Sequence, residues 1–510
     1  MEVVEQGVAV GGLPDLDEKK RKVKHRLRQL ISVQGLVLGV IALGVIIRFY
    51  YFSLTKNQAH WWDSLGYGSI AKQIVYGLWG DNAFLATETI IRPPLLPLLW
   101  SILIRFGASD VFSVFVFGII PSVASVVFIY LLAKELYDTK VALAATFILS
   151  VLWIHLFYSM RVMTDVLSLC FALASLYCFM HKGKMFDSTW YPLSITLISF
   201  AILSRYFYGI VGALYIVFLI VIYGFSFLKK KQFWIGGIIG SIPLLLFFIY
   251  NIRSYGSLLP ASSVYASSAA EKGAFAFYTF GFISHIMGAV LTVFFIIGMI
   301  LMLFELVLGY DSIRKVKKLQ SHFILVSLFI VSFVFFVFIL RAAEDRYLFL
   351  VFPTLLAGAG YGTSIVYSFI KKQSKIAAAI VIIGLLGLGG YSELKYGDSI
   401  IVDKISSYKQ MKDAFLWIKD QTPSTAVLVG DGIDLYSIYY AERKIISWNE
   451  TTFDAVSTKA DFVVIHRFEH QPDNAIQYVL ANQTRFVPIH AEFFDSEQKQ
   501  PAVIVYQIVK

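Results

Sequence analysis

The chain has 510 residues, of which 57% are hydrophobic and only 15% are charged, and its mean hydropathy is +0.69. A soluble domain usually carries about 25% charged residues, because its surface must face water. The composition therefore excludes a single soluble core and predicts an integral membrane protein. The formal net charge of +10 does not indicate nucleic-acid binding, because the basic cluster at 19–28 directly precedes an apolar run and marks a cytoplasmic helix end.

Apolar runs of the length needed to cross a bilayer recur along most of the chain. A helix needs about 20 predominantly apolar residues to cross a hydrocarbon core of about 30 Å. Eleven runs are predicted to be spans: 31–52, 111–133, 141–159, 166–180, 189–204, 206–228, 233–250, 283–305, 322–340, 347–370 and 376–391. The first is too long for a cleaved signal peptide and is predicted to stay as an anchor. The shorter stretch 93–106 is predicted to be an interfacial helix.

The distribution of Lys and Arg predicts the orientation of these spans. With the N-terminus in the cytoplasm, the dense basic clusters all fall on the cytoplasmic side, as the positive-inside bias requires. These clusters are Lys134 to Lys140, His181 to Lys184, Lys229 to Lys231, Arg314 to Lys318 and Lys371 to Lys375. The opposite face then receives the segments 53–110, 161–165, 251–282, 341–346 and everything after 392. The unusual polar residues thus gather on the outer face.

Three domains follow from this arrangement: a basic cytoplasmic N-terminus at 1–29, a membrane domain at 30–391, and an extracytoplasmic α/β domain at 392–510. In the last, AFLWIK (414–419) has helical periodicity. AVLVG (426–430), DFVVIHR (461–467) and AVIVYQI (502–508) are typical of short strands. The sequons at Asn449 and Asn482 carry little weight, because such tripeptides often arise by chance.

One alternative function is a secondary transporter or flippase of a lipid-linked or polar substrate. Such proteins usually keep ionisable groups near the bilayer midplane. No Asp or Glu lies in the middle of a predicted span, which weakens this alternative. The only cysteines, Cys170 and Cys178, share one apolar segment and indicate neither a disulfide framework nor a metal site.

The outer segment 53–110 carries the most specific pattern of polar residues. His60-Trp61-Trp62-Asp63 is followed by Tyr67, Ala71 and Gly77, and then by Arg92-Pro93-Pro94. A lone Asp in a loop is usually a solvated turn residue, and a Pro pair can simply end one helix and start the next. Asp63, however, is flanked by aromatic residues just beyond a membrane helix.

This order of W-x-D, Y, A, G and R-P-P-L-L-P-L-L resembles the first outer loop of GT-C-fold glycosyltransferases. The nearest resemblance is to dolichyl-phosphate-mannose protein mannosyltransferases and lipid A aminoarabinose transferases. Further landmarks of that family match at Arg161–Asp165, Leu203–Tyr206, Asn251–Gly256 and Asp345–Tyr347, so the resemblance covers residues 30–390. One departure concerns the acidic doublet of many protein mannosyltransferases: here Ser64 follows Asp63, which puts a protein-mannosylating activity in doubt.

The resemblance implies an all-α GT-C-like bundle that moves a sugar from a polyprenyl- or dolichyl-phosphate donor to a protein, lipid or glycan acceptor, with inversion. Asp63 is the candidate general base, since a base must be ionised and within reach of the acceptor proton. Asp165 is a second candidate, which would orient an arginine or the acceptor. Equally, Asp165 could cap the helix that begins at Val166.

Arginine is well suited to the departing lipid phosphate, because a guanidinium binds phosphate oxygens in a bidentate manner. Arg92, Arg205 and Arg346 are predicted to bind the donor, together with Tyr67 and Arg253. Pairing with Glu344 and Asp345 is a competing explanation for Arg346. The segment 251–282 is a candidate cover over the site. We expect no cofactor and no essential metal, although a divalent ion is compatible with this chemistry.

Overall fold

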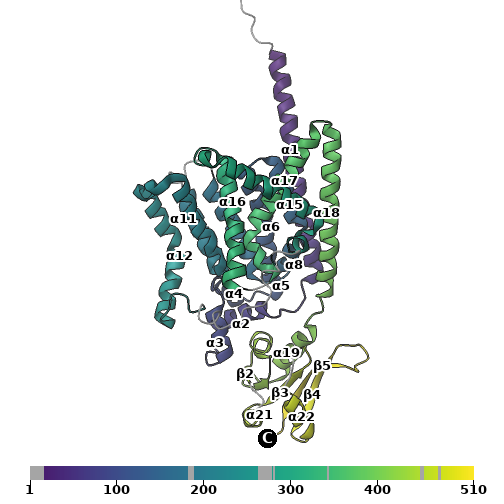
Figure 1. Ribbon diagram of the computed structural model, residues 1–510. Helices are drawn as coiled ribbons and strands as arrows, with labels where there is room; N and C mark the ends of the chain where they lie inside the picture. The colour runs from purple at the N-terminus through teal and green to yellow at the C-terminus, as the bar shows by residue number, and fades with distance from the viewer. Residues whose placement is uncertain are drawn as a thin grey trace, which may run out of the picture.

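The computed structural model describes residues 16–181, 189–261, 278, 282–341, 344–447, 453–468 and 473–510. It confirms the predicted fold class: a bundle of long helices carries a small α/β domain at one end, here termed the α/β end (Figure 1). The helical part of the N-terminus projects from the opposite end. Parts of the predicted cytoplasmic cluster at 181–184, most of the candidate cover 251–282 and the sequon at Asn449 lie outside the described residues.

Eight described helical segments are long and apolar enough to cross a membrane, which identifies a multi-pass membrane protein. They are α1 (Leu16–Thr55), α5–η1–α6 (Asp110–Leu136), η3–α11–η4 (Tyr206–Lys229), α12 (Lys231–Tyr255), α15 (Phe282–Leu308), α16–η6 (Lys317–Leu340), η7–α17 (Asp345–Lys371) and α18 (Lys375–Asp403). A ninth is the pair α7 (Thr139–Val151) and α8 (Trp153–Ser159), bent by 56°. Shorter apolar helices, α9 (Thr164–Met180) and α10 (Trp190–Ser204), occupy the two remaining predicted spans.

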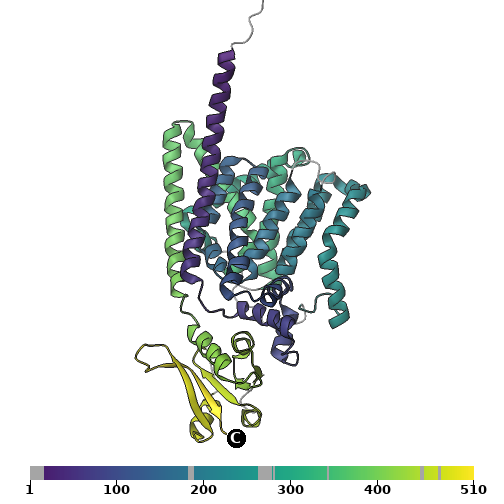
Figure 2. The same cartoon turned by 180° about the vertical axis from the view of Figure 1, so that it is seen from behind.

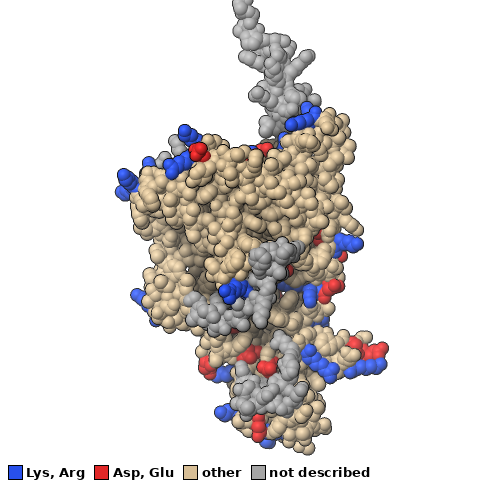
Figure 3. Space-filling view, viewed as in Figure 1, with Lys and Arg blue, Asp and Glu red and all other residues tan. Residues whose placement is uncertain are grey.

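Charged side chains are distributed along the bundle as a membrane protein requires. On the face shown in Figure 3, Lys and Arg gather at the end away from the α/β domain, and charges of both signs cover the α/β domain. The belt between them is almost free of charge. Seen from behind, α1 and α18 run side by side at one edge and α12 stands at the other (Figure 2).

The bend between α7 and α8 is stabilised from both sides. Breaking a membrane helix frees backbone groups that must find other partners, because water is absent there. The carbonyls of Leu149 and Ser150, at the end of α7, each accept a hydrogen bond of 3.2 Å from the buried guanidinium of Arg48. The amide of Trp153, which starts α8, donates to the buried carboxyl group of Glu393 at 3.4 Å. The backbone groups freed by the bend therefore have hydrogen-bond partners, and the bend directs the chain toward residues 160–165.

Short helices lie across the α/β end of the bundle. They are α2 (Asp63–Tyr76), α3 (Ala83–Ile91) and α4 (Leu95–Arg105). The predicted interfacial helix 93–106 corresponds to α4, which has only 11 residues. α2 and α4 lie between the bundle and the α/β domain, and α3 lies to one side of them (Figures 1 and 2).

The α/β domain is built on a mixed sheet in the order β2-β1-β3-β5-β4. Its elements are α19 (Lys409–Gln421), β1 (Val427–Gly430), α20 (Asp434–Tyr436), β2 (Lys444–Ser447), α21 (Phe453–Ser457), β3 (Phe462–His466), α22 (Asp473–Ala481), β4 (Phe486–Phe493) and β5 (Pro501–Ile508). The predicted strands became β1, β3 and β5, whereas β2 and β4 were not predicted. β4 contains Pro488 beside a register shift, and proline is tolerated in a sheet only at an edge or bulge.

The boundary predicted at 391/392 falls inside a helix. α18 continues to Asp403, although the apolar run ends near Gly390. Tertiary contacts explain this extension, because Glu393 and Ile401 are buried against the bundle. The α/β domain itself begins with α19 and shares a hydrophobic core with α2 and α4, in which Leu65 and Trp100 pack with Phe415.

Glycines allow α15 and α17 to approach closely. A Cβ atom on Gly298 would lie 1.9 Å from the carbonyl oxygen of Gly358, and one on Gly362 would lie 2.0 Å from the carbonyl oxygen of Phe294. Small residues at a helix–helix contact let the backbones of membrane helices approach closely. A larger side chain would have to separate α15 from α17.

We expect Gly298→Leu to lower the melting temperature strongly, because overpacking a buried contact typically costs about 1–3 kcal/mol or more. Gly384→Leu in α18 is the matched control, since a Cβ atom there meets no atom within 4 Å. Thermal unfolding of the purified variants in detergent would check this. Equal melting temperatures for the two variants would contradict the close packing of α15 and α17.

Candidate active site

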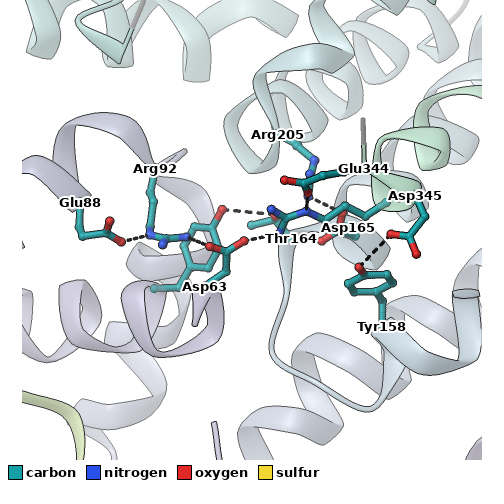
Figure 4. Close-up of polar contacts among 11 residues, drawn as sticks. Asp63, Glu88, Arg92, Tyr158, Thr164, Asp165, Arg205, Glu344 and Asp345 are labelled. Carbon is teal, nitrogen blue, oxygen red and sulfur yellow. Dashed lines mark hydrogen bonds and ion pairs between the residues drawn. The ribbon is translucent and has the colours of Figure 1, made fainter. Parts of the chain in front are cut away.

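Asp63 is the first residue of α2 and lies between two arginines that come from distant parts of the chain. Its Oδ1 accepts a hydrogen bond of 2.9 Å from Nη1 of Arg92. Its Oδ2 accepts another from Nη1 of Arg346. The Asp63 side chain is 27% exposed, so the carboxylate faces an opening while remaining paired. Figure 4 shows the row of polar contacts that runs from Glu88 through Arg92 and Asp63 toward Arg205 and Asp165.

Arg92 is held in place on several sides. Its Nε donates to Glu88 at 2.5 Å, one helical turn earlier, and its guanidinium lies 4.9 Å from the centre of the Tyr67 ring. A Cβ atom on Gly66 would come within 2.5 Å of Arg92 Nε. The absence of a side chain at position 66 therefore leaves the room that the guanidinium occupies.

Arg205 and Asp165 form the most deeply buried ion pair of the site. Nη1 of Arg205 donates to Oδ1 of Asp165, whose side chain is fully buried. Arg205 follows the end of α10 and Asp165 lies in the first turn of α9. Nε of Arg205 and Oδ2 of Asp165 are both buried without a hydrogen-bond partner among the described residues. Asp165 thus contacts an arginine, as one of its two predicted roles requires.

Arg346 lies in η7 (Asp345–Val351) and bridges two acids. Its Nε donates to Glu344, and its Nη1 donates to Asp63. The pairing with Glu344 that competed with a role in the site is therefore present, and the contact with Asp63 is present beside it. Asp345 points elsewhere and accepts a long hydrogen bond of 3.4 Å from Tyr158 (Figure 4).

These side chains surround a cavity of about 230 Å³. Its lining consists of Asp63, Tyr67, Ile91, Arg92, Pro93, Arg205, Tyr206, Phe207, Glu344, Arg346 and Tyr347. A second, mostly apolar cleft of about 710 Å³ shares Arg92 and Tyr206 with it and extends between α2–α4 and α12. The polar cavity therefore adjoins an apolar one at Arg92 and Tyr206.

The two arginines strongly influence the ionisation of Asp63. Burial favours the neutral acid, but the charges of Arg92 and Arg346 outweigh this effect and hold the pKa of Asp63 well below its usual range. Conversely, burial disfavours the charged form of Arg92, whereas the attraction of Asp63 raises the pKa of Arg92 above its usual value. Asp63 is therefore a carboxylate at neutral pH.

The structure brings together six of the seven residues predicted from the sequence. Asp63, Tyr67, Arg92, Arg205 and Arg346 line the cavity, and Asp165 contacts Arg205 directly behind it. Arg253 instead lies exposed on α12 and does not line it. Glu88 was not among the residues predicted from the sequence, and Tyr206 was named only as part of the landmark Leu203–Tyr206. The contact of Glu88 with Arg92 could have been predicted, because Glu88 precedes Arg92 by four residues, the spacing at which opposite charges pair on a helix.

Comparisons with known proteins agree with the resemblance inferred from the motifs. Residues 91–250 match the family model for dolichyl-phosphate-mannose-protein mannosyltransferase. The matched segment covers less than half of the chain. This segment includes Arg92, Asp165 and Arg205. No curated protein sequence matches the chain.

Solved structures of GT-C glycosyltransferases share the fold. ArnT from Cupriavidus metallidurans in the apo state has a TM-score of 0.64 at 12% identity, covering 94% of this chain and 98% of ArnT. The same protein bound to undecaprenyl phosphate gives a TM-score of 0.61 at 12% identity, with coverages of 92% and 98%. The oligosaccharyltransferase of Archaeoglobus fulgidus, in complex with Zn and sulfate, gives 0.57 at 15% identity, covering 84% of this chain and 68% of its own. At these identities the likeness establishes the fold, and the site must support the activity.

Proposed function

We propose that this protein is a membrane glycosyltransferase that moves a sugar from a polyprenyl-phosphate carrier to an acceptor on the α/β side of the membrane. The observation that carries the proposal is one carboxylate, Asp63, held between Arg92 and Arg346 in a cavity at the α/β end of the bundle. The family match and the GT-C fold support it, as does the undecaprenyl phosphate bound by ArnT. The N-terminal basic cluster would then lie in the cytoplasm.

The arrangement suits direct displacement at the anomeric carbon. An acceptor hydroxyl forms the new bond to that carbon while the bond to the phosphate oxygen breaks. Asp63 takes the hydroxyl proton, and the polyprenyl phosphate leaves with the negative charge. A single displacement inverts the configuration and needs one base, which contributes typically 10²–10⁴-fold. It needs no second carboxylate as nucleophile.

Arg205 is the strongest candidate for the phosphate contact. Its Nε is a buried donor without a partner among the described residues, while its Nη1 is fixed by Asp165. A donor that is already oriented and shielded from water stabilises developing negative charge without further reorganisation. Asp165 would act as the residue that orients this arginine.

Arg92 and Arg346 are engaged by Asp63 in the structure, and a donor phosphate would compete with Asp63 for them. Each arginine that turns toward the phosphate removes a positive partner from Asp63 and thereby raises its pKa. A base is most effective when its pKa approaches the working pH. Donor binding would therefore convert a weakly basic carboxylate into a better base.

The apolar cleft fits the carrier's isoprenoid tail. It adjoins the polar cavity at Arg92 and Tyr206, and its walls include Leu98, Leu246 and Tyr250, each about half exposed on the outside of the bundle. A tail placed there keeps its apolar carbons out of water.

The described part of the chain has no group of three or more His, Cys, Asp or Glu side chains placed to hold a metal ion. In the proposed reaction the arginines supply the positive charges that the phosphate needs.

Asp63→Asn should reduce turnover about 10²–10⁴-fold, because an amide cannot accept the acceptor's proton. Donor binding should remain at least as tight, since the change frees Arg92 and Arg346 from a competing carboxylate. The measurement is sugar transfer in nanodiscs beside binding of a polyprenyl-phosphate sugar. Asp81→Asn, which changes an exposed acid between α2 and α3, is the control. Wild-type turnover by Asp63→Asn would rule out this base.

Arg205→Lys should weaken donor binding about tenfold. Lysine keeps a positive charge beside the buried Asp165, so this carboxylate is not left unpaired. The ammonium group of lysine cannot, however, reproduce the planar array of donors of a guanidinium. A lost charge-assisted hydrogen bond is worth about 1.5–3 kcal/mol, and the lower figure corresponds to about tenfold. Binding titration would measure this, with Arg105→Lys at an exposed helix end as control. An unchanged affinity would remove Arg205 from the phosphate site.

The pH dependence should differ between kcat and kcat/KM. Protonated Asp63 cannot act as a base, so activity is lost as pH falls through its pKa. The kcat/KM profile reports the free enzyme, in which that pKa is well below its usual range. The kcat profile reports the donor complex, in which Asp63 has lost arginine partners. We therefore expect the acid limb of kcat at a higher pH than that of kcat/KM, and coinciding limbs would refute the exchange of partners.

A further inference from the structure

The residue that precedes Asp63 has an unusual backbone conformation. Trp62, at the N-cap of α2, has φ +51° and ψ −123°. Glycine adopts this region readily, whereas side chains with a Cβ atom clash there, at a cost of about 1–3 kcal/mol. Such a conformation persists only when surrounding contacts hold it. Those contacts therefore control the direction in which the chain enters α2 and presents Asp63.

Tyr408, in the segment that joins α18 to α19, provides that contact. Nε1 of Trp62 donates a hydrogen bond of 2.8 Å to the hydroxyl group of Tyr408. Tyr408 itself has a left-handed backbone, with φ +58° and ψ +17°. Only five non-glycine residues in the described part of the chain have positive φ, and two of them are bonded to each other here. The adjacent Trp61 ring stacks on Tyr408 at 5.7 Å and 18°.

Further contacts join the segments around Trp62 and Tyr408 to the α/β domain. The Tyr408 ring also stacks on Phe468 of the α/β domain at 5.0 Å. The amide of His60 donates to the hydroxyl of Tyr440 at 2.6 Å, and Lys72 donates to the carbonyl of Tyr439 at 2.5 Å. These contacts anchor the chain to the α/β domain both before and after Asp63. Figure 1 shows α2 next to the α/β domain at this boundary.

We propose that Tyr408 is a positioning residue of the active site, which holds Trp62 in its strained conformation and thereby aims the Asp63 carboxylate. The proposal rests on the proposed function, since it assigns Tyr408 a role through the base. It also gives the α/β domain a catalytic purpose, namely to fix the geometry of a residue that belongs to the membrane domain. Relaxing Trp62 would rotate the start of α2, and a displacement of about 1 Å at a catalytic group can cost about a hundredfold in rate.

Tyr408→Phe tests the hydrogen bond alone, because phenylalanine retains the stacking on Trp61 and Phe468. We expect kcat to fall about ten- to a hundredfold while the affinity for a polyprenyl-phosphate sugar stays unchanged, since Arg205 is not affected. Lys412→Met, one turn along α19, is the matched control. Lys412 donates to the carbonyl of Asn57 at 3.2 Å, so this variant breaks another contact between the domains and should retain wild-type kcat. Equal kcat for Tyr408→Phe and the wild type would overturn the proposal.

Trp62→Gly separates positioning from stability. Glycine adopts the observed φ and ψ without strain but loses the indole that bonds to Tyr408. We expect a melting temperature no lower than that of the wild type, together with a loss of kcat at least as large as in Tyr408→Phe. If Trp62 served only stability, kcat would change in parallel with the melting temperature, and a variant that melts no lower than the wild type would keep its kcat. Retained kcat in Trp62→Gly would therefore contradict the proposal.

Hydrogen exchange provides a readout that does not depend on sugar transfer. In Tyr408→Phe the backbone amides of residues 58–66 should exchange faster than in the wild type, whereas Lys412→Met should leave this segment protected. Unchanged exchange would refute the restraint itself, whatever reaction the protein performs. Faster exchange with unchanged kcat would refute its catalytic role. Absence of transfer by the wild type would instead count against the proposed function, and exchange would still decide whether Tyr408 restrains this segment.

Discussion

The paired charge at Asp63 is the interaction on which the geometry of the α/β end depends. Its two arginine partners stand 29 and 283 positions away in the sequence, so a single carboxylate joins α2, the end of α3 and the turn that leads into α17. At the edge of a low-dielectric region an unpaired charge is costly. The three segments are therefore held together by the same electrostatic requirement that keeps Asp63 ionised.

The same pairing sets a condition on any ligand. Three arginines face four carboxylates in the site: Asp63, Glu88, Asp165 and Glu344. A phosphate can contact the unpartnered Nε of Arg205, but it must displace Asp63 before it gains contacts to Arg92 and Arg346, so a free phosphate ion has little to gain there. A lipid-linked phosphate can draw on burial of its tail in the adjoining apolar cleft. Binding energy from a remote, non-reacting part of a substrate is commonly used in this way to reorganise the reacting centre.

The bundle could be predicted from the sequence because its determinants are local: apolar runs, and basic residues at their ends. Short motifs predicted the candidate site residues. The contact of Asp63 with Arg346 was not predicted, since it depends on how distant helices pack. Strand β4 escaped prediction because Pro488 suits only an edge position, which becomes known once the sheet is assembled. The conformation of Trp62 was equally inaccessible, because nothing in its local sequence demands a conformation that glycine adopts more easily.

Helix α12 gives the protein a mechanical connection to its surroundings. Its apolar stretch at 233–250 extends about 27 Å, close to a hydrocarbon core of about 30 Å, and a bilayer thinner than the apolar stretch makes a helix tilt. α12 stands at the rim of the bundle (Figure 2), and its Leu246 and Tyr250 form one wall of the apolar cleft. A bilayer thinner than this stretch would therefore tilt the wall and change the width of the cleft. Bilayer thickness would thereby influence access to the cleft.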